Sequence, residues 1–257
     1  MMKKKSLVLL VGQSNMSGRG YLTEDDIFEI PALTAIRRDF QWIPAVDPFN
    51  FDRLNLLGLS DSADPFEVKG LSIGGKQRCG VGPGRTFGRM MLEKFPDREV
   101  GLIPASIGGT HVAAWLPGGK DLWSDAHPYD DAITLAKEAM KSGEITAVLW
   151  HQGESDAADK TGNYKESLQA VITNFRKDLD IAHVPFILGG LASFLNPEWP
   201  AAEYTRMIKE VSEENELCGF VPTDDLTDRG DKLHFDTPSQ HELGRRYWEE
   251  FCRLANI

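Results

Sequence analysis

The chain has 257 residues, enough for one large domain or two small ones, and its 41% hydrophobic and 26% charged residues are typical of a globular protein. The formal net charge of −11 argues against a nucleic-acid-binding protein, which would show a basic stripe. No apolar run approaches the roughly 18–20 residues of a membrane span, so we expect no membrane partner. The cysteines are widely spaced and form no CxxC pair, which favours reduced thiols over a disulfide framework or a zinc site: they are Cys79, Cys218 and Cys252.

A lysine cluster at residues 3–5, followed by the apolar run 6–11, has the order of charges found at the start of a secretory signal. The run is shorter than the roughly 7–15 apolar residues of such a signal, and no A-x-A cleavage site follows it. We therefore interpret it as the first strand of the domain and expect a cytoplasmic protein.

Short apolar runs alternate along the chain with longer amphipathic segments, the pattern of βαβ units around a mostly parallel sheet. The predicted strands cover residues 6–11, 99–104, 147–151, 186–191 and 218–221. The predicted helices cover residues 85–94, 130–142, 164–179, 201–214 and 239–255. In the last helix Leu243, Tyr247 and Phe251 recur at helical spacing, and Ser239 is the expected N-cap. The pattern predicts a single domain over residues 1–257.

Residues 21–84 interrupt this alternation with five prolines, scattered aromatic residues and no sustained period. We predict an irregular insertion here, and so long an irregular segment in a compact domain is often functional. Its aromatic residues either form a wall of the substrate site or belong to an insertion that only covers the sheet: they are Trp42, Phe49 and Phe51.

A serine in the sequence Gly12-Gln13-Ser14-Asn15-Met16 directly follows the first predicted strand. Gly12 allows the backbone to turn sharply, so Ser14 is expected at the carboxyl end of the strand, where open α/β sheets bind ligands. A serine hydroxyl becomes an effective nucleophile when a base accepts its proton. Ser14 is therefore a candidate nucleophile.

A base and an orienting acid are offered by the segment 231–234. Asp231 stands three residues before His234, close enough for its carboxylate to meet the imidazole Nδ1 from the same loop. A neutral imidazole is a suitable base near neutral pH. Alone, this segment also fits a surface turn whose acid caps backbone amides. Together with Ser14 it predicts a Ser-His-Asp triad.

Two further strand ends offer hydrogen-bond donors for the oxyanion of a tetrahedral intermediate. The segment 107–110 follows the strand 99–104, and a glycine there, Gly108 or Gly109, exposes a backbone N–H. Gln152 follows the strand 147–151 and offers a side-chain amide. We expect these strand ends to converge on Ser14.

Four sequence blocks resemble, in this order, those of the SGNH (GDSL-like) hydrolase superfamily. They are residues 12–16, 106–110 with the nearby Trp115, 151–156 and 231–234. The branch that looks most similar contains carbohydrate esterases of the sialate O-acetylesterase and acetylxylan esterase type (carbohydrate esterase family six). The resemblance spans nearly the whole chain. It implies a flavodoxin-like three-layer α/β/α sandwich with a five-stranded parallel sheet.

The resemblance implies that Ser14 is the nucleophile, His234 the general acid/base and Asp231 its orienting acid. The oxyanion hole would consist of the backbone N–H groups of Ser14 and Gly108 and the side-chain amide of Gln152, which replaces the asparagine usual in the superfamily. Of the two adjacent glycines, Gly108 is preferred as the donor. The reaction would be a two-step acyl transfer, and because it requires neither a metal nor an organic cofactor, we expect none.

Several residues beside these blocks are expected to contact substrate or to hold the neighbouring loops: Gln13, Asn15, Gly109, Trp115 and Glu154. Trp115 either stacks on a sugar ring or packs in the core. Glu154 and Asp156 resemble the paired acids of a glycosidase, but that interpretation leaves the serine and the 231–234 segment unexplained. Glu154 is more simply a residue that holds neighbouring loops by hydrogen bonds.

The glycine-rich segment 80–85 resembles a phosphate-binding loop, but it lacks the Walker lysine and its spacing, and Pro83 removes an amide donor. We predict a tight turn that packs the following helix near Ser14.

The sequence therefore predicts a serine esterase that removes small acyl groups, foremost O-acetyl groups, from a carbohydrate, and the carbohydrate rests on the resemblance alone. Its expected partner is a small-molecule or oligosaccharide acyl ester. The alternatives are a general short-chain esterase for non-sugar substrates and a catalytically silent carbohydrate-binding protein. A flavodoxin-like cofactor-binding domain is disfavoured, because residues 13–16 form no glycine-rich cradle. The oligomeric state stays open.

Overall fold

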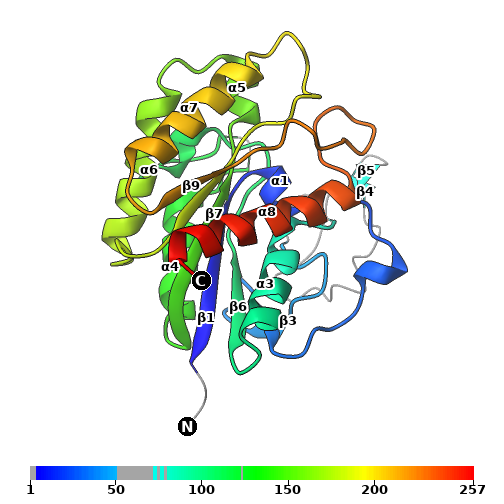
Figure 1. Ribbon diagram of the computed structural model, residues 1–257. Helices are drawn as coiled ribbons and strands as arrows, with labels where there is room; N and C mark the ends of the chain where they lie inside the picture. The colour runs from blue at the N-terminus through cyan, green and yellow to red at the C-terminus, as the bar shows by residue number, and fades with distance from the viewer. Residues whose placement is uncertain (1–3, 51–71, 74–75, 78–79, 123) are drawn as a thin grey trace.

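A mostly parallel sheet forms the centre of the protein (Figure 1), whose computed structural model describes residues 4–50, 72–73, 76–77, 80–122 and 124–257. Within these residues the main sheet has seven strands in the order β3-β2-β6-β1-β7-β8-β9, and only β3 runs antiparallel to its neighbour. The strands are β1 Lys5–Gly12, β2 Leu33–Ile36, β3 Trp42–Pro44, β6 Glu99–Pro104, β7 Gly143–His151, β8 Phe186–Gly189 and β9 Cys218–Val221. A separate two-stranded sheet pairs β4 Ser72–Ile73 with β5 Lys76–Gln77.

The central position of β1 follows from its composition. Residues 7–11 are all apolar and almost fully buried, as expected for a parallel strand that is covered on both faces. Among the five strands that the sequence predicts, the spatial order is 2-1-3-4-5, the flavodoxin-like order. The point at which this order reverses lies between β1 and β7, and ligands of such sheets bind outside the carboxyl ends of the strands at that point.

Helices cover both faces of the sheet and complete three layers (Figure 1). One layer contains α4 Pro128–Ala139, α6 Tyr164–Asp178 and α7 Ala201–Glu214, and the other contains α3 Pro83–Lys94 and α8 Thr237–Ala255. Short helical segments lie in the connections: α1 Ser14–Ser17, η1 Glu24–Asp26, η2 Val112–Trp115 and α5 Glu154–Asp159. The predicted fold class is confirmed, with two more strands in the main sheet than the five that were predicted.

The two additional strands, β2 and β3, lie inside the segment 21–84. Trp42 of β3 packs at the start of β6, where a Cβ added to Gly101 would lie 2.7 Å from the indole ring, and the Lys5 ammonium lies 5.2 Å from the ring centroid. These contacts place Trp42 at the amino ends of β1 and β6, away from the carboxyl edge, so it forms no wall of the site there. Phe49 is 6% exposed and belongs to the core, whereas Phe51 lies outside the described residues.

The last helix begins two residues earlier than predicted. Its N-cap is Asp236, whose side chain accepts a hydrogen bond from the backbone N–H of Ser239 at 2.9 Å. The Ser239 hydroxyl instead accepts a hydrogen bond from the backbone N–H of Thr227 at 2.9 Å, which ties the helix to the loop before it. The predicted N-cap is therefore corrected from Ser239 to Asp236.

Helix α3 packs closely against β1, as predicted for the glycine-rich turn. Pro83 occupies the first turn of the helix, where its missing N–H costs nothing. A Cβ added to Gly84 would lie 2.4 Å from Leu10 Cδ1, so a larger residue here would displace the Leu10 side chain of the central strand.

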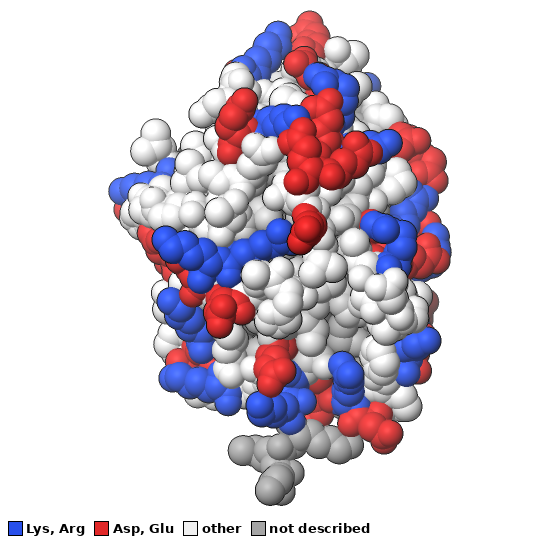
Figure 2. All heavy atoms as spheres, turned by 60° about the vertical axis from the view of Figure 1, so that its left-hand side comes forward, with Lys and Arg blue, Asp and Glu red and all other residues white. Residues whose placement is uncertain are grey.

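Positive and negative side chains are interspersed on the face that carries α6 and α7 (Figure 2). There Lys165 of α6 bonds to Glu210 at 3.0 Å and to Glu214 at 2.7 Å on α7. Such exposed pairs contribute little to stability, typically less than about 1 kcal/mol each. No helix in the described part of the chain is long and apolar enough to cross a membrane. The cytoplasmic location stays a prediction.

Candidate active site

Ser14 begins α1 immediately after the central strand. Gly12 makes the turn with φ of +125°, and a Cβ added there would lie 2.1 Å from the carbonyl oxygen of His151, so the position requires glycine. The backbone N–H of Gln13 donates to the same carbonyl at 2.8 Å. The end of β1 is thereby fixed beside the end of β7, at the point where the strand order reverses.

Ser14, His234 and Asp231 form a continuous hydrogen-bonded chain. The distance between Ser14 Oγ and His234 Nε2 is 3.0 Å, and the distance between His234 Nδ1 and Asp231 Oδ2 is 2.7 Å. The other carboxylate oxygen, Oδ1, accepts the backbone N–H groups of His234 at 2.8 Å and Leu233 at 3.0 Å. With one bond at each ring nitrogen, the imidazole has the orientation of a base that takes a proton from a serine.

The surroundings of the hydrogen-bonded residues favour an ionised Asp231 carboxylate and a neutral His234 imidazole. Burial opposes ionisation of Asp231, but the hydrogen bonds from the His234 ring and backbone and from Arg229 hold its pKa well below the usual range. Arg229 Nε donates to Asp231 Oδ2 at 2.7 Å. Burial lowers the pKa of His234, and although Asp231 opposes this shift, the nearby Arg19 cation lowers the pKa further. The imidazole is therefore neutral and able to accept a proton near pH 7.

Asn15 holds the loop of His234 against the turn that carries Ser14. Its Oδ1 accepts the backbone N–H of Phe235 at 3.2 Å, and its Nδ2 donates to the carbonyl of Leu233 at 3.2 Å. These two residues flank His234, so one side chain fixes the backbone on both sides of the base. The same Nδ2 also donates to Glu154 Oε1 at 2.6 Å. Asn15 and Glu154 thus belong to one hydrogen-bond network that holds the loops beside the site.

Gln13 links the nucleophile turn to the start of α5. Its Oε1 lies 3.4 Å from the backbone N–H of Gly153 and 3.3 Å from that of Ser155. Gly153 is the N-cap of α5, so the amide oxygen of Gln13 accepts donors that the helix itself leaves unpaired.

Gln152 is held by side-chain hydrogen bonds at the end of β7, and its Nε2 also lies 3.4 Å from Gln13 Oε1, next to Ser14. The side chain is fully buried, and its Nε2 donates to Asp156 Oδ2 at 2.5 Å and to the carbonyl of Thr110 at 3.0 Å. Because an amide carries two hydrogens, both are engaged in this arrangement. Gln152 therefore links β7 to α5 and to the loop after β6, and its role as a third oxyanion donor stays a prediction.

The glycine pair Gly108 and Gly109 lies in the loop after β6, the strand next to β1. The backbone N–H of Ile107 donates to the carbonyl of Gly12 at 2.9 Å, which carries the strand pairing to the residue before Gly108. Gly108 is buried, whereas Gly109 is exposed with φ of +74°. The structure thus brings Gly108 to the edge occupied by Ser14, and the choice between the two glycines as oxyanion donor stays a prediction.

Trp115 lies in the core and cannot stack on a sugar. It is 0% exposed, its Nε1 donates to Thr110 Oγ1 at 3.0 Å, and its ring meets that of Trp150 edge to face with centroids 5.3 Å apart. Sequence reasoning left packing and stacking open, and the structure shows packing. The apolar residues of η2, Val112–Trp115, carry the signal for this burial.

Glu154 and His151 form a buried titratable pair under the site. Burial raises the pKa of Glu154 to about 7 and lowers the pKa of His151 to about 3, so both neutral forms are favoured. Glu154 Oε1 lies 3.7 Å from His151 Nε2. Within the described residues, Glu154 Oε2 and His151 Nε2 have no hydrogen-bond partner.

Glu154→Gln is expected to change how stability depends on pH. The folded-state pKa of about 7 lies above the ordinary 4.5, so the folded state holds the extra proton and stability falls as pH rises from about 4.5 to 7. Glutamine cannot ionise, so the variant should gain about 2–3 kcal/mol relative to wild type between pH 5 and pH 8. Denaturant unfolding at both pH values measures this, with the exposed Glu166→Gln as the control that follows wild type. An equal difference between Glu154→Gln and wild type at both pH values would contradict it.

Comparisons with known proteins show the family and the fold of this chain. A family model described as "carbohydrate esterase, sialic acid-specific acetylesterase" matches residues 4–253. A probable carbohydrate esterase of Arabidopsis thaliana is 29% identical over 263 residues, covering 96% of this chain and 91% of that protein. An X-ray structure of an Arabidopsis thaliana protein matches with a TM-score of 0.73 and 25% identity, over 97% of this chain and 98% of that chain. The fold is also that of a carbohydrate acetylesterase from Xanthomonas citri, with a TM-score of 0.64 and 18% identity over 98% of this chain and 57% of that chain.

Proposed function

Because this chain belongs to the carbohydrate esterase, sialic acid-specific acetylesterase family, we propose that it hydrolyses O-acetyl esters of carbohydrates with Ser14 as its nucleophile. The observation that carries this proposal is the chain of hydrogen bonds from Ser14 Oγ through the His234 imidazole to Asp231. It supplies a hydroxyl, a base within reach of its proton and a carboxylate that fixes the tautomer of the base.

The first step is attack of Ser14 Oγ on the ester carbonyl while His234 Nε2 takes the hydroxyl proton. The new oxygen–carbon bond gives a tetrahedral oxyanion, which the backbone N–H groups of Ser14 and Gly108 stabilise. In the described part of the chain, the N–H of Ser14 donates to no backbone or side-chain acceptor. His234 returns the proton to the departing alcohol as the ester bond breaks. Water then attacks the acyl-serine with the same base, which releases acetate and restores Ser14.

Release of acetate from acetylated xylo-oligosaccharides tests the proposed function. The wild-type protein should release acetate from them and from 4-nitrophenyl acetate. Hydrolysis of 4-nitrophenyl acetate alone would indicate a general short-chain esterase, which contradicts the carbohydrate part. No hydrolysis of any ester by the folded protein would contradict the esterase and favour a silent carbohydrate-binding protein.

The pH profile of kcat/KM is expected to reach its plateau in mildly acidic solution. His234 must be neutral to act as base, so activity rises with pH through its pKa, which burial and the Arg19 cation hold below the ordinary 6.5. Arg19→Gln removes that cation and should move the acid limb to higher pH. Initial rates from pH 4 to pH 9 measure both profiles. A wild-type inflection above pH 6.5 would contradict the assignment of His234.

A further inference from the structure

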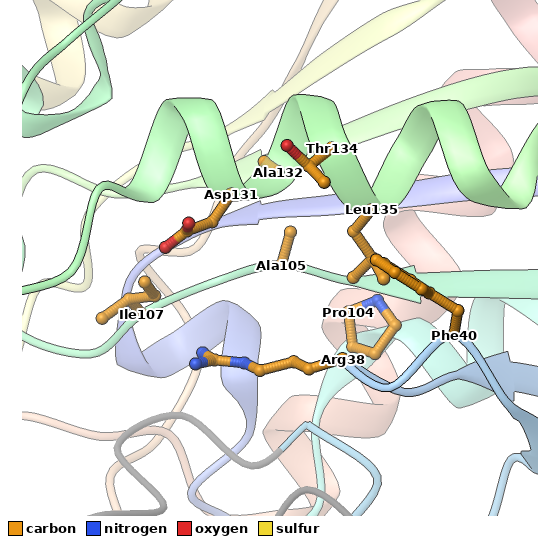
Figure 3. A pocket seen from close by; sticks show the side chains of 9 residues that line it. All are labelled: Arg38, Phe40, Pro104, Ala105, Ile107, Asp131, Ala132, Thr134 and Leu135. Atoms are coloured by element: carbon orange, nitrogen blue, oxygen red, sulfur yellow. The ribbon is translucent and has the colours of Figure 1, made fainter.

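A pocket of about 200 Å³ lies at the carboxyl end of β6, the strand that pairs with β1, between the turn after β2 and α4 (Figure 3). Its apolar lining comes from Phe40, Pro104, Ala105, Ile107, Ala132 and Leu135. Polar groups are supplied by Arg38, Asp131 and Thr134. Ligand pockets commonly combine apolar walls with a few polar groups, and this one is smaller than the roughly 300–1,000 Å³ that drug-sized ligands occupy.

Residues at the end of β6 and just after it line the pocket and also pair with β1, the strand that leads to Ser14. The backbone N–H of Ala105 donates to the carbonyl of Leu10 at 3.0 Å, and that of Ile107 donates to the carbonyl of Gly12 at 2.9 Å. Both residues line the pocket, and Gly12 stands two residues before Ser14. A ligand in this pocket therefore contacts the end of β6 and the residues after it, which pair with β1.

Phe40 at the rim adopts a backbone conformation that a phenylalanine rarely takes. Its φ is +67°, and it closes the tight turn between β2 and β3, in which the backbone N–H of Arg37 donates to the carbonyl of Gln41 at 2.9 Å. The third residue of such a turn is commonly glycine, and a bulky residue there is strained. Phe40 is nevertheless 46% exposed, so core packing does not account for the ring.

The polar groups of the pocket balance in charge. Figure 3 shows Arg38 extending past Ala105 toward the end of the pocket at which Asp131 and Ile107 lie. Within the described residues, neither the Arg38 guanidinium nor the Asp131 carboxylate forms a hydrogen bond or a salt bridge. The pocket therefore offers a free donor and a free acceptor with no net charge, which suits hydroxyl groups rather than a carboxylate.

We propose that this pocket is a subsite for one neutral sugar ring of the ester substrate. Phe40 contacts the apolar face of the ring, the Arg38 guanidinium donates to ring hydroxyls, and the Asp131 carboxylate accepts from them. The inference rests on the proposed function and adds the substrate class to it: an O-acetylated neutral sugar rather than an acidic one.

Phe40→Gly separates a binding role from a structural one. Glycine relieves the backbone strain, so the unfolding midpoint should stay equal or rise, while KM for acetylated xylo-oligosaccharides rises about tenfold. The kcat/KM for 4-nitrophenyl acetate, which has no sugar, should stay within twofold of wild type. Leu217→Gly is the matched control. Leu217 is a partly exposed apolar residue with φ of +50° before β9, and its replacement should leave the kinetic constants for both substrates unchanged. Equal losses on both substrates, or no change on either, would overturn the subsite.

Binding to a Ser14→Ala protein distinguishes failure of the subsite from failure of the proposed function. Calorimetric titration with unacetylated xylo-oligosaccharide requires no turnover, and adding Phe40→Gly or Arg38→Gln should weaken the binding about tenfold. Adding Asp131→Asn should improve binding of an oligosaccharide that carries a uronic acid, because it removes the opposing anion. Sugar binding that depends on Phe40 without any ester hydrolysis would leave the subsite standing and reject the esterase. Ester hydrolysis combined with sugar binding that is unchanged by all three substitutions would reject the subsite and leave the esterase standing.

Discussion

Ser14→Ala is expected to lower kcat for ester hydrolysis by about 10⁴- to 10⁶-fold, since removing a nucleophile of this kind leaves only the oxyanion donors and substrate binding. The geometry predicts so large an effect because Ser14 Oγ is the atom that His234 Nε2 contacts, at 3.0 Å. Acetate release at saturating substrate measures the loss. A fluorophosphonate probe followed by peptide mass spectrometry should label Ser14 of wild type and leave the variant unlabelled.

The matched control is Ser193→Ala. Ser193 is exposed in the loop after β8, at the same edge of the sheet, and its hydroxyl donates to the carbonyl of Asp224 at 2.7 Å. Its replacement should leave kcat within about twofold of wild type. Ser14→Ala with more than a tenth of wild-type activity, or a probe adduct elsewhere, would reject the nucleophile.

Asp231→Asn is expected to lower kcat about 10⁴-fold with little change in fold. The carboxylate accepts from His234 Nδ1 at 2.7 Å, which keeps the proton on that nitrogen and leaves Nε2 free to take the proton of Ser14. An asparagine can instead present its amide hydrogens to Nδ1 and favour the wrong tautomer. It also removes the negative charge that stabilises the imidazolium during the reaction.

Asp225→Asn is the control for loss of an acid near the same helix. Asp225 lies in the loop after β9 and pairs with Arg246 at 2.6 Å, away from the imidazole. Its variant should retain activity, whereas Asp231→Asn should lose it with an unfolding midpoint near that of wild type. Equal activities of the two variants would remove Asp231 from the mechanism.

The sequence predicted the parts of this protein that local patterns determine. Apolar runs mark the buried parallel strands because such strands are covered on both faces. The spacing of Asp231 and His234 predicts their contact because both lie in one turn. In the structure the distance from His234 Nδ1 to Asp231 Oδ2 is 2.7 Å, as that spacing predicts. The family resemblance, confirmed by the family match, adds the order of the blocks, which places distant segments at one edge.

Features that depend on tertiary packing were missed. Strand β2 has only four residues, and its pairing with β6 across residues 34 and 101 leaves no local signal. The direction of the Gln152 side chain is set by Asp156 of α5 and by the carbonyl of Thr110, which lies in the loop after β6. Residue type alone indicates a donor at such a position but does not show what the donor contacts.

The turn before α8 has a consequence for how activity arises during synthesis. The base follows the nucleophile by 220 positions, so a growing chain carries Ser14 long before His234 exists. Domains begin to fold while the ribosome still adds residues, but in the proposed mechanism Ser14 has no proton acceptor until the segment that carries His234 is made and folded. In that mechanism esterase activity requires the nearly complete chain, and a chain that ends before residue 234 carries the Ser14 hydroxyl without its base.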